Sequence, residues 1–187
     1  MGLGAKRLLL NLLSSIAVAA TVAAIGIGLP AINDEIPAAR PVPPGPYSVG
    51  AGVSVVPPPG SGLDATKTRP GRITGTVLFV IGSVRYAVVV SPFDGTLAEA
   101  VQRLQAKIVA TEGYQVVGGQ KPVRTSTGVA GEQGMYSSPG RDGRYAVFLS
   151  DGIDAEVTVA GNGVELHQIL PKVEASILTL RFGKSPQ

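Results

Sequence analysis

The stretch that decides the fold is RYAVFLSDGIDAEVTVA, residues 144–160. Two apolar-rich runs, 144–150 and 153–160, flank the pair Asp151-Gly152, and an Asp-Gly pair in this setting is typical of a type I′ turn. The stretch therefore predicts a β-hairpin. Its second strand alternates, so its apolar side chains are expected to face a core and its polar ones to face solvent. The expected inward set is Ile153, Ala155, Val157 and Val159, and the expected outward set is Asp154, Glu156 and Thr158.

Further strands are expected on both sides of a central helix. Residues 73–81 and 84–90 are rich in β-branched and aromatic residues and flank Gly82-Ser83, which predicts a second hairpin. A short strand at 53–56 should stop at the turn PPPG, residues 57–60. Two runs interrupted by glycine, 114–129 and 131–137, predict the remaining strands.

Two segments have helical periodicity. Thr96 and Glu99 form a capping box, and the apolar stripe that follows predicts a helix ended by Gly113. That stripe is Leu97, Val101, Leu104 and Ile108. Near the C-terminus, Pro171 should lie in the first turn of a helix that runs to Phe182, after a separate short turn at 166–170. The apolar stripe of this closing segment is Leu166, Ile169, Leu170, Val173, Ile177 and Leu180. Strands and helices in this order predict an α+β fold, an antiparallel sheet packed by two helices.

The N-terminus predicts a transmembrane helix ahead of this domain. Lys6 and Arg7 precede an uncharged apolar run, 8–29, whose 22 residues would span about 33 Å as a helix. Because the positive charges stand on the N-terminal side, the N-terminus is expected in the cytoplasm and the rest outside it. The alternative is a cleaved signal peptide with its cleavage site at residues 17–19. Both interpretations predict export.

Composition divides the chain into three parts. Residues 1–30 are the expected anchor, 31–46 a proline-rich linker, and 47–187 an extracytoplasmic α+β domain. Nine of the 31 residues from 30 to 60 are proline, which favours extended polyproline II structure over a helix or sheet. Outside the anchor, 14 basic residues stand against 13 acidic ones, without a basic block, which excludes nucleic acid as an expected partner. The chain has no cysteine, so no disulfide or thiolate metal site is available.

The search for chemistry yields no catalytic, cofactor-binding or metal-binding residues. His167 is the only histidine and is expected on a solvated helix surface. The run Gly118-Gly119-Gln120-Lys121 lacks the ending of a phosphate loop and is expected to be a glycine-rich turn. The acidic residues Asp151, Asp154 and Glu156 could contact calcium, but a solvated hairpin edge is the favoured interpretation. Four cations are expected at one loop end of the sheet, where they could meet anionic headgroups or phosphorylated glycans: Lys121, Arg124, Arg141 and Arg144.

The element order resembles one known family. A strand that ends in a Pro-Gly turn (53–60), two hairpin strands, the helix at 96–111 and the closing LHQILPKVEASILTLRF (166–182) resemble PsbP-like domains, which include actinobacterial LpqN-type envelope lipoproteins. The resemblance implies an α/β/α sandwich that acts as a non-catalytic accessory or binding domain. It transfers no catalytic residue.

Two functions follow as expectations. The first is a single-pass, plasma-membrane-anchored, non-enzymatic accessory protein that works beside an envelope protein complex. The alternative is a carrier that binds a small apolar or lipid ligand in a pocket lined by Phe79, Tyr86 and Phe148. The same three residues would also fill an ordinary core.

Overall fold

The computed structural model describes residues 39–183 of the chain. The predicted span at 8–29, its orientation and the possible cleavage site all lie outside these residues. Among the described residues, no helix has the length and apolar character needed to cross a membrane.

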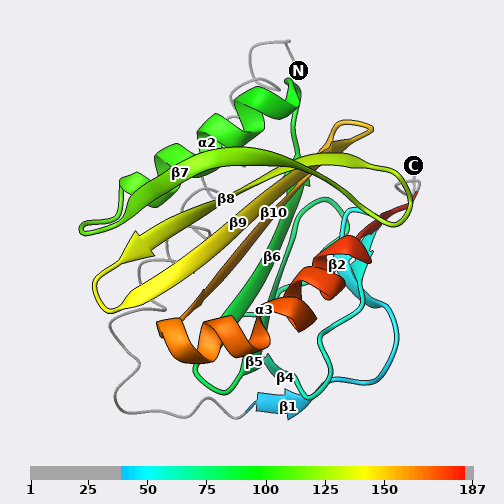
Figure 1. The fold of residues 1–187 in the computed structure, drawn as a ribbon. Helices are drawn as coiled ribbons and strands as arrows, with labels where there is room; N and C mark the ends of the chain where they lie inside the picture. Colours follow the sequence, from blue (N-terminus) through cyan, green and yellow to red (C-terminus); the bar gives the residue numbers. More distant parts are fainter. Residues whose placement is uncertain (1–38, 184–187) are drawn as a thin grey trace.

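Eight antiparallel strands form one large sheet in the order β1-β4-β5-β6-β10-β9-β8-β7 (Figure 1). A second sheet has three strands in the order β11-β3-β2. The strands of the large sheet are β1 (Ala39–Pro41), β4 (Gly62–Asp64), β5 (Gly75–Ile81), β6 (Val84–Pro92), β7 (Gln115–Arg124), β8 (Ala130–Ser138), β9 (Arg141–Ser150) and β10 (Ile153–Gly161). Those of the small sheet are β2 (Tyr47–Gly50), β3 (Val53–Val55) and β11 (Arg181–Phe182).

The predicted hairpin at 144–160 is confirmed and lies at the centre of the large sheet. Ser150 pairs with Ile153 across a turn in which Asp151 and Gly152 both have positive φ, 49° and 73°, as a type I′ turn requires. Strand β10 pairs with β9 on one side and with β6 on the other, so Ala155 lies between Phe148 and Val90. The hairpin therefore joins the two halves of the sheet.

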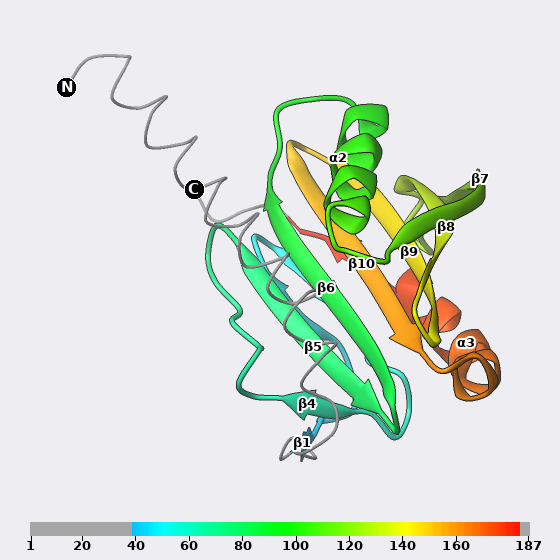
Figure 2. The same cartoon turned by 90° about the vertical axis from the view of Figure 1, so that its left-hand side faces the viewer.

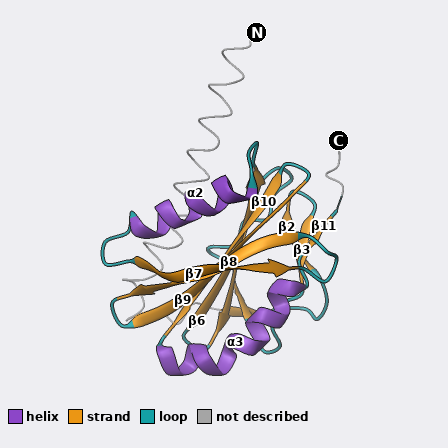
Figure 3. Cartoon of the chain, turned by 45° about the horizontal axis from the view of Figure 1, so that its top comes forward, coloured by secondary structure: helices purple, strands orange, loops and turns teal. Residues whose placement is uncertain are grey.

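Helix α2 (Leu97–Val109) covers one face of the large sheet, over β7, β8 and β9. Helix α3 (Gly163–Leu178) packs on β6, β9 and β10, and the small sheet packs on β5 and β6. Figures 2 and 3 show the two helices on opposite sides of the large sheet. The prediction of an antiparallel sheet packed by two helices is confirmed.

Strand alternation separates the buried side chains into two cores. The larger core lies between the large sheet, α3 and the small sheet, and includes Phe79, Tyr86, Phe148, Val157 and Leu180. The smaller core lies beneath α2 and includes Leu104, Ile108, Tyr136, Tyr145 and Val147. The even-numbered residues of β9 from Ala146 to Phe148 thus face α3, while Tyr145 and Val147 face α2.

Helix α2 begins as its sequence predicts. The Glu99 N–H donates to Thr96 Oγ1 at 3.3 Å, and the Thr96 N–H donates to Glu99 Oε2 at 2.7 Å, which completes the capping box. These hydrogen bonds lower the pKa of Glu99. The helix ends at Val109, before Gly113.

The prediction for the closing segment is wrong in two respects. Residues 163–178 form one helix with Pro171 inside it, and the chain then enters β11 instead of remaining helical to Phe182. A proline removes the hydrogen bond to the carbonyl four residues earlier, which belongs to His167. Both Pro171 and His167 are exposed, so water can satisfy that carbonyl and the helix continues.

Other strand boundaries also differ from the predictions. Residues 39–41, placed in the linker, pair with β4 at the edge of the large sheet, a position where Pro41 is tolerated. Strand β5 begins at Gly75, after the exposed Ile73. Strand β7 ends at Arg124, because a turn closed by the Thr125 N–H to the Val129 carbonyl separates it from β8.

Candidate functional site

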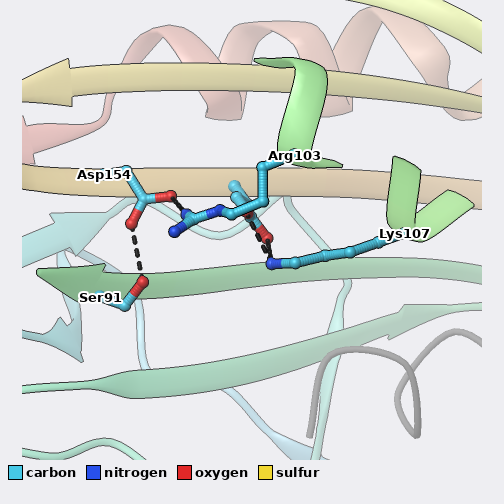
Figure 4. A network of polar contacts seen from close by, with 5 residues as sticks. Ser91, Arg103, Lys107 and Asp154 are labelled. Atoms are coloured by element: carbon cyan, nitrogen blue, oxygen red, sulfur yellow. Dashed lines mark hydrogen bonds and ion pairs between the residues drawn. The ribbon is translucent and has the colours of Figure 1, made fainter. Parts of the chain in front are cut away.

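A cluster of four charged side chains lies between α2 and the centre of the large sheet (Figure 4). Helix α2 contributes Arg103 and Lys107, and β10 contributes Asp154 and Glu156. Lys107 Nζ donates to both carboxylate oxygens of Glu156 at 2.9 Å, and Arg103 Nη2 donates to Glu156 Oε1 at 3.0 Å. Arg103 also forms an ion pair with Asp154. Two cations and two anions thus neutralise one another.

Neighbouring residues complete this network. Ser91 on β6 donates its hydroxyl to Asp154 Oδ1 at 2.8 Å. The guanidinium carbon of Arg103 lies 4.3 Å from the centre of the Phe93 ring, a cation–π arrangement. Burial raises the pKa of Asp154, and the negative charge of Glu156 raises it further, while Arg103, Ser91 and Lys107 oppose the rise. The network therefore holds a carboxylate in an environment that favours its protonated form more than water does.

This arrangement corrects the prediction of a solvated outer face on β10. Asp154 and Glu156 are 0% and 3% exposed because Arg103 and Lys107 of α2 lie against them, and Thr158 on the same face is 9% exposed. Alternation identified the residues that share a face but did not identify what covers it. The signal that was available is the pair Arg103 and Lys107, four residues apart beside the apolar stripe of α2, where they can reach carboxylates two residues apart on a strand.

The three acidic residues considered for calcium are not brought together. Asp151 is exposed in the turn, whereas Asp154 and Glu156 are held by the two cations of α2. Within residues 39–183, no group of three or more His, Cys, Asp or Glu side chains is arranged to hold a metal ion. The favoured interpretation of a solvated hairpin edge holds for Asp151 alone.

The four cations expected at one loop end are dispersed. Arg124 pairs with Ala130 and Arg141 pairs with Ser138, so these two lie at opposite ends of β8. Arg144 lies on the α3 side of β9, because its neighbour Tyr145 faces α2. Lys121 belongs to an exposed part of β7. The predicted cluster is therefore wrong.

A different pair of cations does share one end of the sheet. Arg85 on β6 and Arg141 on β9 lie on the α2 side, where each has its Nη1 atom buried without a hydrogen-bond partner among the described residues. Burial lowers the pKa of Arg85; the Asp64 charge opposes this and the Arg141 charge adds to it. Sequence reasoning missed Arg85, since only the register of β6, β10 and β9 brings it near Arg141.

The remaining candidate residues lie on the surface of α3 or within strand β7. His167 is exposed on α3, as predicted. Its neighbour Glu165 accepts a hydrogen bond from the Ser83 N–H at 3.0 Å, and the hydrogen bonds from Ser83 lower the pKa of Glu165. Residues 118–121 form an irregularity within β7, where the register with β8 shifts, and not a turn between elements.

The aromatic residues considered for a ligand pocket fill the larger core. Phe79, Tyr86 and Phe148 are each 0% exposed. The rings of Phe79 and Tyr86 lie 5.5 Å apart, and Ser176 Oγ donates to the Tyr86 hydroxyl at 3.3 Å. Burial raises the pKa of Tyr86. These contacts are those of packed core residues.

Comparison with known proteins identifies the fold. No protein-family model and no curated protein sequence matches the chain. The solution structure of cyanobacterial PsbP (CyanoP) from Synechocystis sp. PCC 6803 matches with a TM-score of 0.54 and 12% identity, and covers 74% of this chain and 92% of that one. The crystal structure of LpqN, involved in cell envelope biogenesis of Mycobacterium tuberculosis, matches with a TM-score of 0.51 and 15% identity, covering 74% and 84%. The resemblance predicted from the order of elements is thus confirmed: this chain has a PsbP-like fold.

Proposed function

We propose that the chain is a membrane-anchored, extracytoplasmic, non-enzymatic accessory or interaction protein of the cell envelope. The observation that carries the proposal is the closed network beneath α2. Its four charged side chains, Arg103, Lys107, Asp154 and Glu156, bond to one another, so these charges serve the attachment of α2 to the sheet. A catalytic acid or base has to reach a substrate, and His167 stands apart from these groups on α3.

Two further observations support this proposal. The fold is shared with CyanoP and with LpqN, and the latter is described as involved in cell envelope biogenesis. The apolar run at 8–29, flanked by Lys6 and Arg7, supports an anchor with the domain on the outer side. The proposed location is the plasma membrane, with a single pass and a cytoplasmic N-terminus.

The membrane arrangement can be tested with the full chain in its own cells. Protease added to intact spheroplasts should digest the domain, and the protein should remain in the membrane pellet after carbonate washing. A variant with Lys6 and Arg7 replaced by Glu serves as the orientation control, since it should lose part of its protease sensitivity. A processed form that starts near Ala20 and is released by the wash would contradict the anchor.

The accessory role requires a protein partner. Crosslinking of the full-length chain in its membrane, followed by identification of the captured proteins, should return the same envelope proteins in repeated experiments. The alternative, a lipid carrier, predicts a ligand that stays with the purified protein in native mass spectrometry. Because Phe79, Tyr86 and Phe148 are packed in the core, we expect no apolar ligand to be retained there.

A further inference from the structure

Arg85 and Arg141 face the same side of the sheet at the same end. Arg85 pairs with Ala160, and Ala160 pairs with Gly143, two residues from Arg141 on β9. Strands β6 and β9 are two strand spacings apart, and Arg141 lies two residues along β9 from Gly143. The Cα atoms of the two arginines are therefore about 12 Å apart, and their long side chains can reach toward each other across this distance. Of the residues between them on this face, Ala160 is small and Gly143 is covered by the Tyr136 ring.

The positive charge of this pair is not neutralised by ion pairing. The ion pairs of residues 39–183 involve Arg103 and Lys107, and neither Arg85 nor Arg141 forms one. Asp64 is the carboxylate that acts on Arg85, but its Oδ1 already accepts hydrogen bonds from the N–H groups of Thr66 and Lys67, at 2.9 and 3.2 Å. Two like charges therefore approach each other, each with a buried nitrogen that lacks an acceptor.

Aromatic side chains border the pair. The Tyr136 ring lies over Gly143, and the Tyr114 ring stacks on Tyr136 at 6.1 Å between centroids. The charge of Arg141 acts on both tyrosines. Tyr136 donates its hydroxyl to the Val159 carbonyl at 3.1 Å, while the buried Tyr114 hydroxyl lies beside Ser138. Tyr114 thus offers a hydroxyl donor near the Arg141 guanidinium.

We infer that Arg85 and Arg141, with the Tyr114 hydroxyl near Arg141, bind an oxyanion of the phosphate type. Buried polar groups in proteins almost always have a partner, and an unpartnered one calls for an explanation such as a bound ion. The planar guanidinium fork matches phosphate oxygens, and charge-assisted hydrogen bonds of this kind are among the strongest. A bound oxyanion would also remove the repulsion between the two arginines. This inference goes beyond the proposed function and does not depend on it.

The test uses the full-length chain purified in an uncharged detergent. Inorganic phosphate is titrated against chloride at constant ionic strength, with calorimetry for affinity and the backbone amide signals of Ala160 and Gly143 for location. A second titration uses glycerophosphoglycerol, the soluble headgroup of an anionic phospholipid. Tighter binding of the headgroup would identify a lipid as the source of the phosphate, and tighter binding of inorganic phosphate would identify a free ion.

Substitutions then separate this site from general charge attraction. Arg85→Gln and Arg141→Gln should each weaken binding about tenfold or more, because each removes a charged hydrogen-bond donor. Arg144→Gln is the matched control, since it removes the same charge from the same strand on the opposite face and should leave the affinity unchanged. If Arg141→Gln fails to fold, Arg141→Lys keeps the charge without the fork and should bind more weakly than the parent.

Two results would overturn the inference. One is the absence of saturable binding for both phosphate compounds, together with unmoved amide signals at Ala160 and Gly143. The other is an equal loss of affinity in Arg144→Gln and Arg141→Gln, which would show attraction to the whole surface, without a site.

Discussion

One face of the large sheet carries positive charge in two different ways. Beneath α2, Arg103 and Lys107 meet Asp154 and Glu156, and each charge has a partner from the chain itself. At the end of the same face, Arg85 and Arg141 approach each other without a carboxylate ion pair. The ion pairs of Arg103 and Lys107 hold α2 on the sheet. Arg85 and Arg141 form no ion pair with the described residues, so their charge is available to a ligand from outside the chain.

The largest effect is expected from removal of Glu156, whose carboxylate is the shared acceptor of the network. Glu156→Ala leaves Lys107 buried without its anion, and breaking a buried pair in this way costs about 3–5 kcal/mol. Urea denaturation of the full chain should show this loss in the free energy of unfolding. Glu174→Ala, on the exposed surface of α3, is the matched control and should change stability by less than about 0.5 kcal/mol. An equal change in the free energy of unfolding for the two variants would mean that the network does not stabilise the fold.

The same substitution should destabilise the fold at the arginine that forms an ion pair and leave it nearly unchanged at the arginine that does not. Arg103→Met removes the ion pair with Asp154 and should lower the free energy of unfolding by about 2–3 kcal/mol, because Arg103 is partly exposed and its hydrogen bonds are charge-assisted. Arg85→Met removes a charge that forms no ion pair and should change the free energy of unfolding by less than about 0.5 kcal/mol. Thermal unfolding of the two variants beside the parent is the measurement. A comparable loss in Arg85→Met would show that Arg85 has a partner in the fold.

A smaller, pH-dependent effect is expected from Asp154. Its pKa is raised in the folded protein, so the folded state binds more protons than the unfolded state between the ordinary carboxyl pKa and the raised value. The stability contributed by this group is therefore present below the ordinary pKa and is lost as pH rises through the raised one. Asp154→Asn should flatten this part of the stability–pH profile. A profile that keeps the same slope would contradict the raised pKa.

The smallest effect is expected at His167. The side chain is exposed on α3, outside both charged regions. His167→Ala should keep the parent's stability within about 0.5 kcal/mol and should capture the same proteins on crosslinking. If function were lost while stability and membrane attachment remained, the non-enzymatic proposal would fail.

The sequence predicts those parts of the fold that local chemistry controls. The Asp151-Gly152 turn and the Thr96–Glu99 capping box each need specific residues at fixed spacing, and both are present in the structure. Three strands of three or four residues, β1, β2 and β4, carry too few residues to show a periodicity, and their pairing depends on distant partners. The helix through Pro171 is tolerated because the affected positions are exposed, which the sequence does not reveal.

The charged sites were harder to predict for a related reason. Alternation placed Asp154, Glu156 and Thr158 on one face correctly, but a polar face can be covered when the covering helix brings matching charges. The pair Arg85 and Arg141 comes from strands separated by α2, β7 and β8 in sequence and by one strand in space. Such a pair becomes visible only when strand order and register are known.

The pairing of strand β11 affects the order in which the domain folds. Strand β11 pairs with β3, and the Val56 N–H donates to Thr179 Oγ1 at 2.8 Å across 123 positions of sequence. Contacts between residues this far apart form slowly, because the intervening chain must be ordered first. The small sheet cannot be completed until the C-terminal residues have been synthesised and, if the domain is exported, translocated. A chain that stops before Arg181 would therefore leave β3 without its β11 partner.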